Sequence, residues 1–233
     1  MKTDKTEANY RNWNNQHSLL RRLLEKDKDY HQALETFSSH HEEIHALELR
    51  PGEHWSFPDE VLRGLTDEQM RWIPAEGGHS VVWVIWHIAR IEDVTMNILL
   101  ADSPQVFHIG DWQGKLESPY ENVGNEMSPE DIARLSQAIN LEALMSYRLT
   151  VGKRTREIVR DLNFAELHGL PAGERLNRLA REGAVGEKAA WLLEYWGGKA
   201  ASNLLLMPAT RHCFVHLNEV RHMLSKLKRL SVN

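Results

Sequence analysis

The stretch HSVVWVIWHIARIEDVTMNILLAD, from His79 to Asp102, gives the strongest helix signal in the chain. Its apolar residues recur at helical spacing, and in the first half they cover most of the circumference of the predicted helix. A helix that is apolar on nearly every side is buried by other helices. We therefore predict that residues 79–102 form the central helix of the fold.

Outward from this stretch, helical spacing of apolar residues continues, and no segment shows the sustained alternation that a half-buried strand needs. The sequence therefore predicts an all-α chain. Capping signals mark helix starts at Ser56, Thr66 and Ser128. Longer helices are predicted over residues 5–27, 29–49, 128–139, 141–162 and from Pro208 onward, with short helices between the glycines of 163–200.

The long polar connection of residues 103–127 contains proline and glycine at several positions. A connection of this length inside one domain is usually a lid or a binding element, and we expect residues 103–127 to cover a substrate pocket.

The composition argues against some classes of partner and cellular location. A chain of 233 residues suits a single domain. The net charge is -5, with basic and acidic residues well mixed, so a nucleic-acid partner is not expected. No apolar stretch approaches the roughly 20 residues of a membrane span. With one cysteine and no apolar leader, the expected location is the cytoplasm. The 13 histidines are the unusual feature.

Two histidines of the last predicted helix share one face. His212 and His216 are four residues apart, and Glu219 follows in the same stripe. His87, in the central helix, also has apolar neighbours on its face of the helix. Facing histidines in a helical bundle can form a metal site, since a buried imidazole nitrogen needs a partner. The alternative is that each imidazole is a core group with a hydrogen-bond partner.

A second pattern lies in HHEEIH, where His41, Glu42 and His45 fit the HExxH motif of zinc hydrolases. On one helix His41 and His45 would hold a metal, with Glu42 as general base. The extended form of the motif fails, because Glu48 stands where glycine is needed and Pro51 where a third histidine is needed. A zinc hydrolase is therefore the less favoured interpretation.

The segments HSVVWVIWHIARIEDV and MPATRHCFVHLNE resemble the second and last helices of the DinB and YfiT-like superfamily. Its members are four-helix bundles that hold a metal with histidines at one end. The resemblance implies one DinB-like domain over residues 1–233, with additional short helices, a long loop and an N-terminal helical extension over 1–28. It also implies a divalent metal, Zn²⁺ or Ni²⁺ and alternatively Fe²⁺, on His87, His212 and His216.

The same resemblance implies a function, because the superfamily includes transferases that use low-molecular-weight thiols and thiol-dependent isomerases. We therefore expect a metal-dependent enzyme, a thiol transferase or a hydrolase, acting on a small molecule, often as a homodimer. In this hypothesis Glu219 orients an imidazole or acts as base. The alternative is a protein without catalytic activity. It would be either an interaction protein or a helical bundle in which the metal only joins helices.

Other residues are expected to lie outside the site. We expect Glu92 and Asp93 to be structural or interfacial, Cys213 to pack in the core, and His40 to be solvated. His79 is expected to be a cap or a surface group. The tryptophans are assigned to core or helix packing: Trp83, Trp86, Trp191 and Trp196.

Overall fold

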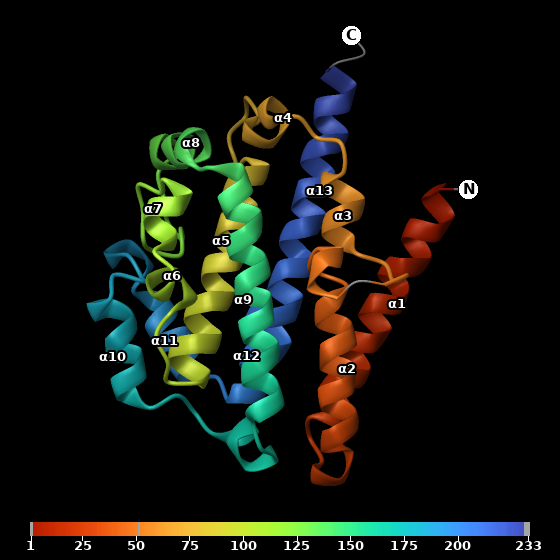
Figure 1. Ribbon diagram of the computed structural model, residues 1–233, viewed down its shortest axis with the longest axis vertical. Helices are drawn as coiled ribbons and strands as arrows, with labels where there is room; N and C mark the ends of the chain where they lie inside the picture. Colours follow the sequence, from red (N-terminus) through yellow and green to blue (C-terminus); the bar gives the residue numbers. More distant parts are fainter. Residues whose placement is uncertain (1, 51, 231–233) are drawn as a thin grey trace.

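The computed structural model describes residues 2–50 and 52–230, and every regular element in them is helical. Four helices lie alongside one another: α2 (Tyr30–Glu42), α5 (Val81–Asp93), α9 (Leu141–Asp161) and α13 (His212–Leu230) (Figure 1). Helix α5 packs against both α9 and α13, and α2 packs against α9. The predicted all-α, four-helix architecture is confirmed. None of the described helices is long and apolar enough to span a bilayer.

Helix α5 is central, as its sequence predicts. Every residue from Ser80 to Leu100 is buried. The Ser80 hydroxyl caps the helix by accepting the amide of Trp83, and after Asp93 the chain continues as a π-helix, η3 (Val94–Leu100). Because α5 is enclosed on every side, each polar residue that it carries must find a partner from another element.

Side-chain caps start three further helices where the sequence predicts them. Ser56 precedes α3 (Phe57–Leu62), Thr66 precedes α4 (Asp67–Arg71), and Ser128 precedes α8 (Pro129–Ala138). In each case the hydroxyl accepts an amide of the first turn, which would otherwise have no partner.

The predicted helix over residues 29–49 is wrong at its end, since α2 stops at Glu42. The carbonyl oxygens of the next three residues are bound by groups from elsewhere in the chain. In order, they accept hydrogen bonds from the amide of Phe57, the guanidinium of Arg148 and the hydroxyl of Ser56. These donors hold the chain in a turn, after which comes a short 3₁₀ helix, η2 (Leu47–Leu49).

The last helical run begins earlier than predicted. It starts with α12 (Ala201–Leu206), passes through a π-helix, η6 (Met207–Arg211), and continues as α13. Pro208 lies inside this run although it has no amide to donate. The Thr210 hydroxyl lies 2.9 Å from the carbonyl oxygens of Leu205 and Leu206, so carbonyls near the proline still have a donor.

Helix α1 (Lys2–Leu23) packs on α2, at the outer side of the bundle (Figure 1). Its Trp13 ring is fully buried and stacks on Phe214 of α13 and on His40, with centroid distances of 3.9 and 4.0 Å. The apolar face of α1 therefore covers its own bundle. His40 is only 2% exposed, so the expectation that it is solvated was wrong, because Trp13 and His17 of α1 cover it.

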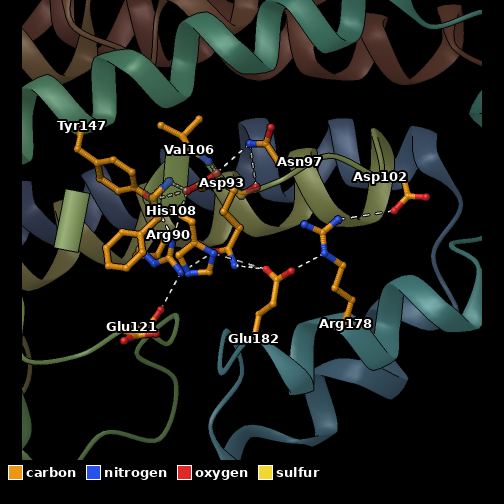
Figure 2. Close-up of polar contacts among 12 residues, drawn as sticks. Arg90, Asp93, Asn97, Asp102, Val106, His108, Glu121, Tyr147, Arg178 and Glu182 are labelled. Carbon is orange, nitrogen blue, oxygen red and sulfur yellow. Dashed lines mark hydrogen bonds and ion pairs between the residues drawn. The ribbon is translucent and has the colours of Figure 1, made fainter. Parts of the chain in front are cut away.

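Residues 103–127 form two short helices, α6 (Val106–Ile109) and α7 (Trp112–Leu116), which pack against α9. A buried network holds this segment to α5 (Figure 2). The carboxylate of Asp93 accepts the amide of Val106 at 2.8 Å and the hydroxyl of Tyr147 at 2.6 Å. Arg90 donates to Asp93 at 3.2 Å and to the Glu121 carbonyl at 2.7 Å. The segment is thus firmly anchored rather than a free lid.

Short helices occupy the region before α12, as predicted. They are η4 (Phe164–His168), α10 (Gly173–Arg181), η5 (Glu187–Ala189) and α11 (Trp191–Gly197). Three of the four tryptophans assigned to packing are buried: Trp83, Trp86 and Trp196. Trp191, at the start of α11, is 50% exposed and has an edge contact with Tyr195, so of the predicted core or helix-packing role the core part was wrong.

Candidate metal centre

His87 lies in the buried middle of α5 with its ring fixed on two sides. Trp83, one turn earlier, stacks on it with a centroid distance of 4.6 Å. Its Nδ1 lies 2.5 Å from the carbonyl oxygen of Val123, at the end of the 103–127 segment. Because a carbonyl only accepts, Nδ1 must carry the hydrogen, and in the neutral ring Nε2 is left bare. That bare nitrogen is available to a metal ion.

The last helix brings two more imidazoles to this ring. His212 is the first residue of α13, and His216 is one turn later. Their ring centroids both lie 5.0 Å from that of His87 and 4.6 Å from each other. One nitrogen from each ring lies within 4.8 Å of the other two. The three histidines predicted from the sequence are therefore neighbours in space.

The protonation of His87 and His212 suits a bound cation. Burial, together with the nearby His216, lowers the pKa of His87 to about 3. Burial and the two neighbouring imidazoles hold the pKa of His212 well below its usual range. Neutral imidazoles offer lone pairs rather than positive charge. In addition, Nδ1 of His212 is buried without a hydrogen-bond partner. The donor set fits a divalent metal on these grounds.

Glu219 links two histidines at the edge of this cluster. Its carboxylate oxygens lie 2.8 Å from Nδ1 of His216 and 2.8 Å from Nδ1 of His79. Burial raises its pKa, but these hydrogen bonds outweigh burial and lower it to about 2. The carboxylate is therefore ionised and turns Nε2 of His216 toward the other rings.

His79 is a residue that sequence reasoning missed, since it was expected to be a cap or a surface group. Its ring stacks on Trp83 at 3.7 Å and donates to Glu219. The spacing holds a usable signal: His79, Trp83 and His87 follow one another at four-residue intervals, and such residues share one stripe of a helix.

The histidines of the HExxH segment form a separate cluster. His41, near the end of α2, and His45, in the turn that follows, both contact Glu92 of α5. Their Nε2 atoms lie 2.8 and 3.1 Å from the two carboxylate oxygens of Glu92. The sequence predicts a structural or interfacial role for Glu92 and gives no sign of the two histidines that meet it.

The glutamate that would act as general base in a HExxH zinc hydrolase is not free here. Glu42, which would be the general base, is bound by Arg50 at 2.9 Å and by Arg156 at 2.5 Å. The segment is not one continuous helix, because α2 ends at Glu42. Glu42 is thus committed to two guanidinium groups rather than to the histidines.

The comparison with known proteins agrees with this architecture. The sequence model of the DinB superfamily matches residues 53–193, which is more than half of the chain. No curated protein matches the sequence. The matched span includes α5 with His87 and also α9, whereas His212 and His216 follow it along the chain. The chain belongs to the DinB superfamily.

Proposed function

We propose that this member of the DinB superfamily is a metal-dependent enzyme whose divalent cation is held by His87, His212 and His216. The observation that carries the proposal is the convergence of three imidazole nitrogens, from two helices far apart in sequence, within 4.8 Å. Two of the rings also donate Nδ1–H to a protein oxygen, on Val123 and on Glu219. Metal-ligating histidines are typically oriented in this way.

The donor set indicates the class of chemistry. Three neutral imidazoles suit Zn²⁺ and Ni²⁺, and Fe²⁺ as an alternative. Such a cation keeps coordination positions open and lowers the pKa of a thiol or water that binds to it. From the resemblance to thiol-using members of the superfamily, we propose transfer of a low-molecular-weight thiol to a small electrophile, or thiol-dependent isomerisation.

The surrounding residues hold the ligands in place. Val123 and Trp83 fix the ring of His87, one by a hydrogen bond and one by stacking. Both carboxylate oxygens of Glu219 are engaged by histidines, so we assign it a positioning role rather than that of a general base. Because the side chain of His216 is 18% exposed, substrate would approach from the His216 side.

Metal analysis of purified variants tests the site. His87→Ala and His216→Ala should each lose one equivalent of metal, measured by mass spectrometry, relative to the unaltered protein. His222→Ala is the matched control, since His222 is an exposed histidine on the same helix and should retain the full content. Retention of all metal by both site variants would reject the triad.

Catalysis is tested separately, on unaltered protein whose metal content has been verified. We expect conjugation of at least one low-molecular-weight thiol to an electrophile, retained in His222→Ala and lost in His216→Ala together with its metal. If the metal is intact and no thiol is consumed, the bundle instead uses its metal only to join helices.

The proposed partners are a small-molecule substrate and a second copy of the chain, with no nucleic acid or membrane. No nucleic-acid partner is proposed because basic and acidic residues are mixed along the sequence, whose net charge is -5. Sedimentation velocity tests the homodimer: the expected species has twice the 26.9 kDa chain mass, and a single species at the chain mass would reject it.

A further inference from the structure

The cluster of His41, His45 and Glu92 is the second group in the described residues that could hold a metal ion. All three side chains are buried, with exposed fractions of 0%, 1% and 0%. The two imidazole rings lie close together, with a centroid distance of 4.3 Å. Two elements far apart in sequence thus place two nitrogens and a carboxylate around one point, away from water.

The separations of the donor atoms match those of a coordination sphere. Ligands bound about 2.0–2.1 Å from Zn²⁺ lie about 3.3 Å apart in a tetrahedron. The Nε2 atoms of His41 and His45 lie 2.8 and 3.1 Å from the oxygens of Glu92. Small outward movements of these side chains would admit a cation among the three.

The charges around this point are mixed, because the Glu92 carboxylate attracts a cation and the nearby Arg148 guanidinium repels one. A buried carboxylate is stable only when positive charge or strong donors surround it. Arg148 of α9 is a nearby buried guanidinium, but it donates to the Ile44 carbonyl and not to Glu92. Nδ1 of His41 and Nδ1 of His45 are also buried without hydrogen-bond partners. Both oxygens of Glu92 thus have histidine partners, while the opposite nitrogen of each ring has none.

The fold provides both room for the cluster and a route to it. The His45 ring rests against Gly152 of α9, where an added Cβ would lie 2.7 Å from ring atoms. A cavity of about 460 Å³ has His45 and Arg148 in its wall, together with Asp59 and Met145. A cation entering through this cavity would reach the cluster beside His45.

We propose that His41, His45 and Glu92 form a second divalent-metal site, whose two-histidine, one-carboxylate donor set suits Zn²⁺ and also Fe²⁺. It is distinct from the three-histidine site and does not depend on the function proposed for that site. Its ligands would be the two histidines of the HExxH pattern and a carboxylate from α5, but Glu42, the general base of that motif, is bound by Arg50 and Arg156. Both candidate sites draw on α5, through His87 and Glu92.

The first test leaves the proposed site untouched. In His87→Gln/His216→Gln, dialysed against chelator and then against Zn²⁺, we expect one tightly bound zinc per chain. X-ray absorption of this zinc should show two imidazoles and oxygen ligands. If this variant folds as the unaltered chain does, by circular dichroism, and binds no zinc, the second site does not exist.

The second test removes the proposed ligands with nearly isosteric changes. Glu92→Gln and His45→Gln should each reduce the zinc content of the otherwise unaltered chain by one equivalent, while His31→Gln, at an exposed histidine, should not. Unchanged zinc content in both folded variants would show a hydrogen-bonded cluster and overturn the proposal. Loss only in His87 or His216 variants would support the first site alone, so the two proposals fail separately.

Discussion

Glu219 shows how one side chain can control a site without binding the metal, because each of its carboxylate oxygens holds a different histidine. In Glu219→Gln only one oxygen remains to accept, so either His216 or His79 loses its acceptor. We expect metal affinity to fall by about 10- to 100-fold, measured by competition with a chelator. Glu76→Gln, which removes an exposed partner of Lys226, should leave the affinity unchanged. Equal affinities in both variants would exclude a positioning role.

The contact of α1 with the bundle predicts a dependence of stability on pH. His17 Nδ1 lies 3.2 Å from His40 Nε2. Burial, with the charges of Arg211 and Arg21, lowers the pKa of His17 to about 4, and burial lowers that of His40 to about 2. As the pH falls, these two histidines become protonated near pH 6.5 in the unfolded chain, but only at lower pH in the folded chain. The free energy of unfolding should therefore decrease as the pH falls from about 6.5 toward 4.

Urea unfolding at pH 7.5 and pH 5.0 measures this loss. We expect His17 to account for at least about 1 kcal/mol of it. The variant His17→Gln, which has no titrating ring, should accordingly lose less stability between the two pH values than the unaltered chain. The same pH dependence in both proteins would contradict this assignment.

Some site residues could be predicted one by one, and others could not. His212 and His216 share a face by spacing alone, and His87 is notable for its apolar neighbours. Glu92 could not be placed, because a helical wheel gives the direction of a side chain but not the segment that meets it. His41 and His45 reach Glu92 only through the tertiary packing of α2 beside α9 and α5.

At the scale of elements, the π-helix η6 depends on Thr210 as a donor for the carbonyls of Leu205 and Leu206. Thr210→Val keeps the shape of the side chain but removes this buried hydroxyl. We expect the free energy of unfolding to decrease by about 1–3 kcal/mol, measured in urea. Thr150→Val is the control, since its hydroxyl makes a similar bond in an exposed position and water can replace it. Equal losses in the two variants would contradict the account.

Asp93 connects α5 to the 103–127 segment and neutralises the buried Arg90 (Figure 2). Asp93→Asn removes the negative charge and leaves a guanidinium unpaired in the core. The expected decrease in the free energy of unfolding is about 3 kcal/mol or more, again by urea titration. Asp161→Asn, at an exposed pair with Arg160, should change stability little. A small effect at Asp93 would mean that the network does not anchor the segment.

Element boundaries were predictable where local chemistry sets them. Ser56, Thr66 and Ser128 cap helices at the predicted positions, because a hydroxyl one residue before the first turn acts locally. The C-terminal end of α2 and the start of the last helical run were not predictable. Distant donors bind the carbonyls after Glu42, and the hydroxyl of Thr210 binds carbonyls of the turn that contains Pro208.

At the scale of the whole molecule, the sequence was sufficient for the all-helical class and for the central place of α5. The sequence of α5 is apolar on nearly every side, and such a helix must lie in the centre of the fold. The sequence did not determine whether α1 would cover its own bundle or another chain. In the structure Trp13 is buried against Phe214 of the same chain.

The bundle places its two histidine clusters on different sides of one buried helix. The last helix supplies His212 and His216 to His87, and the N-terminal half supplies His41 and His45 to Glu92. Cys213 is buried beside His212, with its sulfur 3.9 Å from a Glu92 oxygen, so the two clusters are close neighbours.

Anomalous X-ray diffraction from zinc-loaded crystals, recorded on both sides of the zinc absorption edge, tests the central claim most directly. The account predicts a strong anomalous peak within bonding distance of nitrogens from His87, His212 and His216. Well-ordered density for these three rings with no anomalous peak among them, in zinc-saturated crystals, would contradict it.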